Sequence, residues 1–199
     1  MIRPRVGDFV YSDGELDIMR FDIRNFKSMG VKGFVFGALT EEGEIDVAHT
    51  ESLVQEALPL EVTFHRAFDM SRNLEEAFRA IQGIKNITRI LTSGGKPKVI
   101  DGISTLRKLI GLSDRVGIMP GSGINDQTIE ALLPILRLDR PREIHMSGGE
   151  WVEGRSEVEP KAGMGMGASD EHANDIWRSF THNIENVRDM IDVLEDNDY

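Results

Sequence analysis

Residues 61–69, EVTFHRAFD, decide the fold. The stretch begins as an apolar, β-prone run and ends abruptly in His65, Arg66 and Asp69. A buried strand has no use for ionisable groups gathered at its carboxyl end, whereas ligands of α/β folds bind at that end. This stretch therefore predicts a parallel strand that delivers side chains to a functional site.

Four further apolar runs stop in the same manner, at Gly, Ser, Thr, His or Arg. They are MIRPRVGD at 1–8, ILTSGG at 90–95, VGIMPGSG at 116–123 and EIHMSGG at 143–149. Since the carboxyl ends of parallel strands share one edge of a sheet, the five runs predict one face that carries a site.

Helical patterns alternate with the strand patterns. Strands are expected at 2–4, 34–37, 60–64, 89–91, 116–119 and 143–146. Helices are expected at 13–29, 46–58 (N-cap Asp46), from Ser71 (capping box with Glu75), at 98–112, 125–136 and 170–194. A Gly-rich loop at 148–169 and a frayed acidic tail at 195–199 complete a single domain, 1–199. Six βα units predict an α/β fold, either an open doubly wound sheet or part of an eight-unit barrel.

The composition restricts the classes of partner. A net charge of −11 opposes binding to nucleic acid and to anionic membranes. The chain has no cysteine, so it offers neither a thiolate metal site nor a cysteine nucleophile. It also lacks the roughly 20 consecutive apolar residues of a transmembrane helix, and the start MIRPRVGDF lacks the core of a signal peptide. We expect a cytoplasmic protein.

Arg3 and Arg5 alternate along the first run, so on a strand both guanidinium groups would point to one side. Planar forks of this kind suit a carboxylate or a phosphate. The alternative is a structural ion pair with Asp8.

His65 is a candidate general acid or base, with Asp69 or Asp8 setting its tautomer, and Asp8 is a second candidate for moving a proton. The alternative for His65 is a satisfied core histidine. Arg66 and Asp69 either bind a ligand or pair with each other.

The glycine-containing loops 92–95 and 120–123 each join a strand to a helix, an arrangement that can cradle an anion. Tight βα turns need glycine in any case. The candidate binding residues here are Thr92, Ser93, Gly94, Gly121 and Gly123. His145 and Ser147, two residues apart on the last expected strand, could face the same site.

Five motifs together resemble the CutC family, which is named for copper homeostasis and has a (β/α)8 TIM-barrel fold. The motifs are MIRPRVGDFVYSD (1–13), GFVFGALTEEGEID (33–46), VTFHRAFDM (62–70), RILTSGG (89–95) and MPGSGI (119–124). Residues 166–172, MGASDEH, fit as well. The family places MIRPR on its third strand, so the resemblance implies an incomplete barrel of about six units. Departures occur at Val6, at Ser122, at 147–149 and in the absent copper-ligand cysteines.

Two functions follow as expectations. The resemblance implies a copper-homeostasis protein, for which Met164, Met166 and His172 are the candidate Cu(I) ligands, although methionine more often fills space. The residues themselves favour an enzyme acting on a small phosphorylated or carboxylated metabolite. A third possibility is a fold remnant without activity. We also expect the chain to form a homo-oligomer.

Overall fold

The computed structural model describes residues 1–138, 143–158, 161, 163–164 and 168–196. The chain divides into two compact units. The first unit consists of 1–123 and 131–145, and the second of 124–130 and 146–199. The single domain expected over 1–199 stays a prediction.

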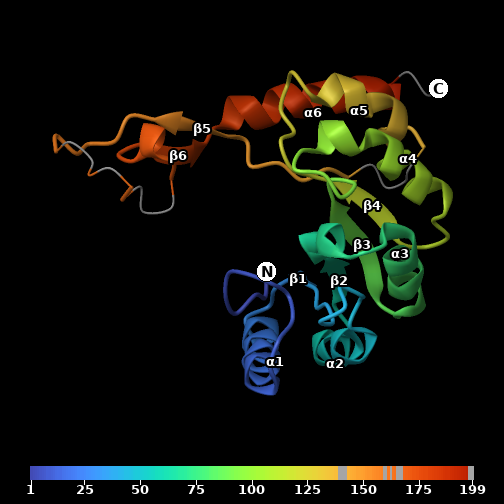
Figure 1. Cartoon of the computed structure of the whole chain (residues 1–199). Coiled ribbons are helices and arrows are strands. Elements are labelled where there is room, and N and C mark those ends of the chain that lie inside the picture. The colour runs from blue at the N-terminus through green and yellow to red at the C-terminus, as the bar shows by residue number, and fades with distance from the viewer. Residues whose placement is uncertain (139–142, 159–160, 162, 165–167, 197–199) are drawn as a thin grey trace. The chain divides into compact units, whose positions relative to one another are not determined.

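The first unit contains a parallel sheet of four strands, whose order is β1-β2-β3-β4 (Figure 1). The strands are β1 (Gly33–Phe36), β2 (Glu61–Phe64), β3 (Ile87–Thr92) and β4 (Gly117–Pro120). A doubly wound sheet reverses its strand order at a switch point, whereas barrel strands follow the chain without reversal. The observed order is that of a barrel wall, and the fold is of the TIM-barrel type.

Two further segments lie beside this sheet without forming strands of their own. The backbone N–H of Ile2 donates to the carbonyl of Val35 at 2.8 Å. At the other edge the N–H of His145 donates to the carbonyl of Pro120 at 2.9 Å, beside a single parallel bridge between Gly121 and His145. The expected strands 2–4 and 143–146 are therefore wrong as strands, because each makes too few ladder bonds. With one such segment at each edge, the wall consists of six neighbouring segments, four of which are strands.

The core of the sheet follows from its register. One row of apolar side chains is paired across all four strands, and each is at most 2% exposed: Phe36, Phe64, Ile90 and Ile118. Because side chains alternate along a strand, Thr63 and His65 belong to the opposite face. The strand that buries Phe64 therefore also determines on which side His65 emerges.

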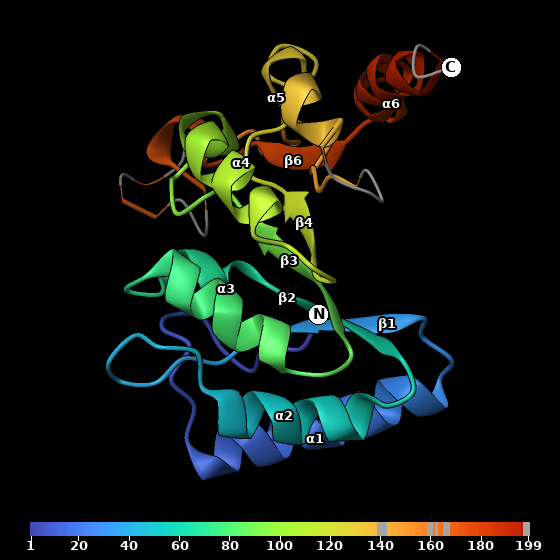
Figure 2. The same ribbon diagram turned by 90° about the vertical axis from the view of Figure 1, so that its right-hand side faces the viewer.

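One helix precedes β1 and three helices follow β1, β2 and β3 in turn, with two short 3-10 turns. They are α1 (Asp13–Ser28), α2 (Val47–Ala57), α3 (Leu74–Gly83) and α4 (Ile103–Gly111), and the turns are η1 (Arg66–Met70) and η2 (Val99–Gly102). Helices α1 and α2 lie side by side (Figure 2), joined by an ion pair in which Arg24 Nε donates to Glu56 at 2.8 Å. None of the described helices has the length and hydropathy needed to cross a membrane.

The helix starts confirm one predicted cap and correct two. Asp46 is the N-cap of α2, and its carboxylate accepts from the N–H of His49 at 3.0 Å. The helix expected from Ser71 begins at Leu74, since the amide of Asn73 accepts the first free N–H groups. The helix expected at 125 begins later, as α5 (Ile129–Leu136), because the Asn125 side chain caps a turn over 125–128. The helix expected at 98 begins with η2.

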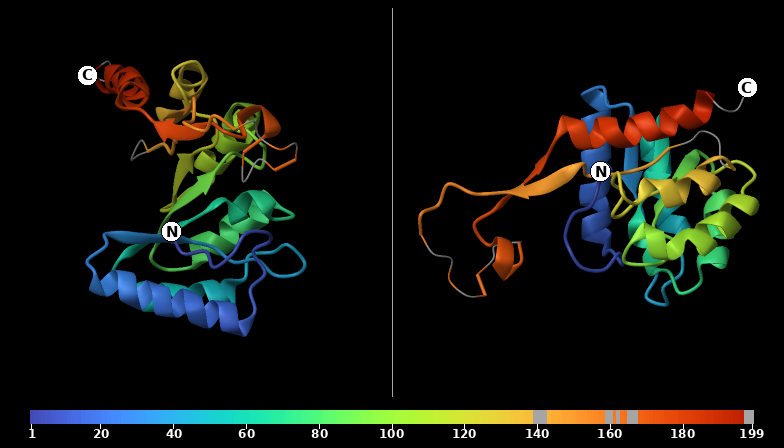
Figure 3. Two further views of the ribbon diagram at one scale, coloured as in Figure 1. Left: turned by 90° about the vertical axis from the view of Figure 1, so that its left-hand side faces the viewer. Right: turned by 90° about the horizontal axis from the view of Figure 1, so that it is seen from above.

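The second unit contains an antiparallel hairpin followed by a helix (Figure 3). Strand β5 (Gly149–Val152) pairs with β6 (Ile176–Ser179), and a 3-10 turn, η3 (Asp170–His172), lies between them. Helix α6 (Thr181–Asp196) follows. Two expectations were therefore wrong: residues 149–152 are a strand and not loop, and the helix expected over 170–194 begins at Thr181. Trp151 and Trp177 face each other across the hairpin at 5.1 Å, and such a cross-strand aromatic pair stabilises strands.

Candidate functional site

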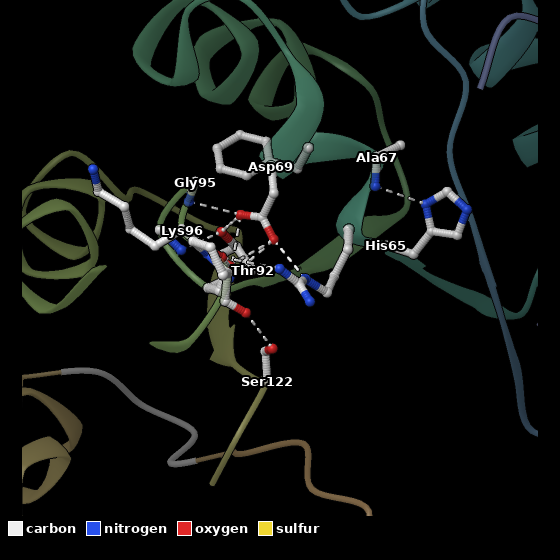
Figure 4. A network of polar contacts seen from close by, with 12 residues as sticks. His65, Ala67, Asp69, Thr92, Gly95, Lys96 and Ser122 are labelled. Carbon is white, nitrogen blue, oxygen red and sulfur yellow. Dashed lines mark hydrogen bonds and ion pairs between the residues drawn. The ribbon is translucent and has the colours of Figure 1, made fainter. Parts of the chain in front are cut away.

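Asp69 is the centre of a dense polar cluster just after β2. Its side chain is 5% exposed, and its carboxylate accepts hydrogen bonds from the hydroxyl of Thr92, the N–H groups of Ser93 and Gly95, and Nε of Arg66. The loop 92–95 is thus an anion-binding cradle, as its glycines predicted. The anion that fills it, however, is the Asp69 carboxylate (Figure 4).

This arrangement changes the interpretation of the predicted loop residues. Thr92 and Ser93 are fully buried, and their donors point at Asp69 and not at open space. Gly94 is required by packing, since a Cβ at this position would lie 2.6 Å from the carbonyl oxygen of Gly102. Asp69 and loop 92–95 therefore hold the carboxyl ends of β2 and β3 together, and their donors are not available to a ligand.

The second loop is tied to the first. The N–H of Gly121 donates to the carbonyl of Thr92, and the Ser122 hydroxyl donates to the carbonyl of Pro97 at 2.7 Å. Ser122 and Gly123 both adopt positive φ angles, so the chain turns sharply here. Gly121 and Gly123 accordingly hold the loop in place.

Arg66 joins the Asp69 cluster to open space. Its Nε donates to Asp69 at 2.7 Å, and one terminal nitrogen donates to the Ser93 hydroxyl at 2.7 Å and to the carbonyl of Lys96 at 3.1 Å. The side chain is nevertheless 39% exposed. The predicted pairing of Arg66 with Asp69 is confirmed, and the guanidinium is held rigidly at the edge of a cleft.

Arg3 and Arg5 do not act as a matched pair. Arg5 donates to Glu15 and to the carbonyls of Asp8 and Val10, and it forms an ion pair of 2.9 Å with Asp8. The structural ion pair weighed as the alternative is thus observed for Arg5. Arg3 makes one backbone bond, to the carbonyl of Gly7 at 2.8 Å. Residues 4–7 are bent and not extended, so the alternation of a strand does not apply to them.

Glu15 shows how strongly Arg5 is committed to structure. The pKa of the Glu15 carboxyl lies below its ordinary value, first because the backbone N–H of Ser12 donates to it and second because Arg5 does. The same carboxylate completes the capping box of α1. Arg5 therefore anchors the N-terminal loop to a helix start.

His65 is buried at the end of β2, with 4% of its surface exposed. Its Nδ1 accepts from the N–H of Ala67 at 3.3 Å, and the ring is turned away from Asp69 (Figure 4). The expectation that Asp69 or Asp8 sets its tautomer is therefore wrong, because a backbone amide has that role. Burial, reinforced by the charge of Arg3, lowers the pKa of His65 to about 4, so the ring is neutral at physiological pH.

The first unit contains a cleft of about 590 Å³. Its lining combines guanidinium groups, carboxylates and apolar side chains: Arg3, Gly7, Asp8, Phe9, Val10, Leu39, Thr40, Glu41, Gly43, Arg66, Asp69 and Met70. We call it the Arg3 cleft. Of the predicted site residues, it brings together Arg3, Asp8, Arg66 and Asp69.

Several residues of the Arg3 cleft were missed in the sequence. Thr40 and Glu41 follow the carboxyl end of β1, so the rule that located His65 could have found them. Phe9 and Met70 carry no such signal. Phe9 lies 4.6 Å below the guanidinium of Arg3, a contact between loop residues that no local pattern announces.

The other predicted residues lie elsewhere. His145 is exposed beside β4, while Ser147 belongs to the second unit, where its carbonyl accepts from the Ser179 hydroxyl at 2.7 Å. His172 Nδ1 lies 2.8 Å from the Asp175 carboxylate, and its ring stacks on that of Trp151 with centroids 4.5 Å apart. Met164 is 56% exposed, and Met166 lies outside the described residues. Within the described part of the chain, no three His, Asp or Glu side chains come together as a metal site.

Known proteins that are similar to this chain are named CutC or cutC homolog. The profile of the CutC family matches residues 1–149. A Pasteurella multocida protein of the CutC family is 36% identical over 193 residues, which are 96% of this chain and 77% of that protein. The mouse copper homeostasis protein cutC homolog is 45% identical over 134 residues, 67% of this chain but only 49% of the mouse protein. The crystal structure of CutC from Streptococcus agalactiae is similar with a TM-score of 0.64 and 30% identity, covering 72% of this chain and 69% of that one.

Proposed function

Because this chain belongs to the CutC family, whose mouse and human members are named copper homeostasis proteins, we propose that it acts in copper homeostasis. The match spans about half the length of those two relatives, so the activity of a whole family member is part of the proposal. We propose further that the chain acts through a small anionic molecule bound in the Arg3 cleft, and not by holding copper with its own side chains.

The observation that carries this proposal is the pair of guanidinium groups on the wall of the cleft. Arg66 is fixed by Asp69 and Ser93, and Arg3 lies over the Phe9 ring, so both cations are positioned before a ligand arrives. Guanidinium groups bind carboxylate and phosphate oxygens through charge-assisted hydrogen bonds. They stand as local exceptions on a chain whose net charge is −11.

The remaining lining narrows the class of ligand. Asp8, with 69% of its side chain exposed, and Glu41 also border the cleft and would repel a molecule with several negative charges. Val10, Leu39 and Met70 supply apolar surface. The lining therefore suits a small molecule with one anionic group and an apolar body.

A direct copper site has weaker support in the residues. Thiolates and thioethers are the ligands that Cu(I) prefers, and the sequence contains no cysteine. Among the described residues, no three His, Asp or Glu side chains are gathered as a metal site. We therefore propose that the role in copper homeostasis is indirect, through the bound molecule, and that Met164, Met166 and His172 do not bind copper.

The Arg3 cleft would also serve an enzyme acting on a carboxylated or phosphorylated metabolite. Asp8 would then be the group that exchanges a proton with solvent, since its carboxylate is exposed at the cleft while His65 is buried and neutral. We also propose, as the sequence led us to expect, that the protein is cytoplasmic and forms a homo-oligomer. Size-exclusion chromatography with light scattering tests the oligomer.

Ligand-induced stabilisation tests the cleft. We expect millimolar carboxylates and phosphate monoesters to raise the melting temperature of the wild-type protein, since a ligand that binds only the folded state stabilises it. Arg3→Gln is expected to weaken the binding about tenfold or more, because it removes one charge-assisted contact. Arg24→Gln, which removes another exposed cation, on α1 and away from the Arg3 cleft, is the control and should bind as the wild type does. Equal affinity of all three proteins, or no stabilisation by any probe, would contradict the proposal.

A further inference from the structure

The imidazole of His65 carries a hydrogen-bond donor that the fold does not use. Its Nδ1 lone pair accepts from the N–H of Ala67, so in a neutral ring the proton resides on Nε2. Nε2 is buried and has no hydrogen-bond partner among the described residues. A buried donor without an acceptor is costly, and in native structures such a group calls for an explanation.

The ring is held in place from the side of β1 and β2. A Cβ at Gly37 would lie 2.9 Å from Nδ1 of His65 and 2.7 Å from the Phe64 ring. The absence of a side chain at Gly37 is therefore what allows the imidazole to lie against β1. The unsatisfied N–H is a property of a fixed ring and not of a mobile surface residue.

Phe9 links this donor to the Arg3 cleft. Its ring meets the His65 ring edge to face, with centroids 5.0 Å apart, and it also lines the cleft. The guanidinium of Arg3 lies over the same Phe9 ring, at 4.6 Å from the centroid. Phe9 thus contacts both the cation that would hold an anion and the imidazole ring that carries the buried donor.

We propose that His65 is a ligand-binding residue whose Nε2–H donates to an uncharged oxygen of the molecule that Arg3 holds, with Phe9 as the side chain that moves to admit it. The inference rests on the proposed function, because it assigns the second recognition point of the same site. The ligand class it names is an organic anion with a neighbouring hydroxyl or carbonyl oxygen, such as a hydroxy acid or an oxo acid.

A neutral histidine suits this role better than a charged one would. An imidazolium beside Arg3 would compete for the same anionic group, whereas a neutral N–H recognises an uncharged acceptor. A site built around a buried donor also rejects molecules that lack the matching oxygen, because the donor then stays unpaired. His65 would therefore select for the oxygen while Arg3 provides the attraction.

Nuclear magnetic resonance of the imidazole nitrogens tests the inference on the wild-type chain. With ¹⁵N-labelled histidine, we expect His65 to show a neutral ring protonated at Nε2, identified by its loss in His65→Phe. The probes are α-hydroxyisocaproate and isocaproate, which differ only in one hydroxyl group. The hydroxy acid should shift the Nε2–H signal and bind about three- to tenfold more tightly than isocaproate, and His65→Phe should bind both equally.

The outcomes separate the two proposals. If both acids bind with equal affinity and leave the His65 signals unchanged, the role of His65 is overturned while the anion site at Arg3 stands. If neither acid binds, the proposed function fails and this inference fails with it. If His65→Phe keeps the wild-type preference for the hydroxy acid, another group reads the oxygen and the inference is wrong.

Discussion

Asp69→Ala is expected to lower the free energy of unfolding by about 3–5 kcal/mol, the cost of removing one partner from a buried ionic network. The Asp69 side chain is 5% exposed, and its carboxylate accepts hydrogen bonds from the Thr92 hydroxyl, from two backbone N–H groups and from Arg66. After its removal the buried donors of Thr92 and Ser93 lose their acceptor, and the Arg66 guanidinium loses its ionic partner. Urea denaturation at neutral pH measures the loss.

A matched control on the surface isolates this effect. Asp17 also pairs with an arginine three residues away, at 2.7 Å from Arg20, but its side chain is 77% exposed. Asp17→Ala should therefore change the stability by no more than about 0.5 kcal/mol. Similar losses for the two variants would show that Asp69 does not organise loop 92–95.

Acidification is expected to remove about 3 kcal/mol of stability that depends on His65. The pKa of His65 is about 4 in the folded chain and 6.5 without the fold, because burial disfavours the charged ring. Between these values the unfolded chain binds more protons than the folded chain. The contribution is therefore complete above pH 6.5 and is lost as the pH falls toward 4.

The difference between wild type and His65→Phe isolates this loss from that of other groups. Carboxyls with lowered pKa values, such as those of Glu15 and Glu56, also destabilise the acidified protein, but they do so in both chains. As the pH falls from 7.5 to 4.5, we expect the unfolding free energy of the wild type to decrease by more than that of His65→Phe. Parallel curves would mean that the fold does not lower the pKa of His65.

The sequence was sufficient for the four strands of the sheet because that information is local, whereas the choice between an open sheet and a barrel came from the family resemblance. Each of β1 to β4 is a short apolar run that stops at a polar turn, and the cap at Asp46 follows from a side chain next to the helix start. The hairpin of β5 and β6 was missed since it joins segments 24 or more residues apart through the pair of Trp151 and Trp177. Nothing near Trp151 in the sequence indicates its partner.

The site was predictable in composition but not in detail. The position of Arg66 and Asp69 after a strand indicated a polar cluster, which lies beside loop 92–95, whereas His65 points away from it. Which group fills the cradle depends on a carboxylate 23 residues before Thr92, and no spacing rule gives that contact. The different roles of Arg3 and Arg5 depend likewise on the bend over residues 4–7 and on Glu15 of α1.

Competition for Cu(I) against a chromogenic chelator tests most directly whether the chain acts through the Arg3 cleft and not as a copper ligand. The reduced protein would be titrated alongside a cysteine-containing copper-binding peptide as the positive control. We predict that the chelator keeps its copper in the presence of this chain and loses it to the peptide. Transfer of one equivalent to the chain, abolished by Met164→Ala or His172→Ala, would contradict the account and assign copper to the second unit.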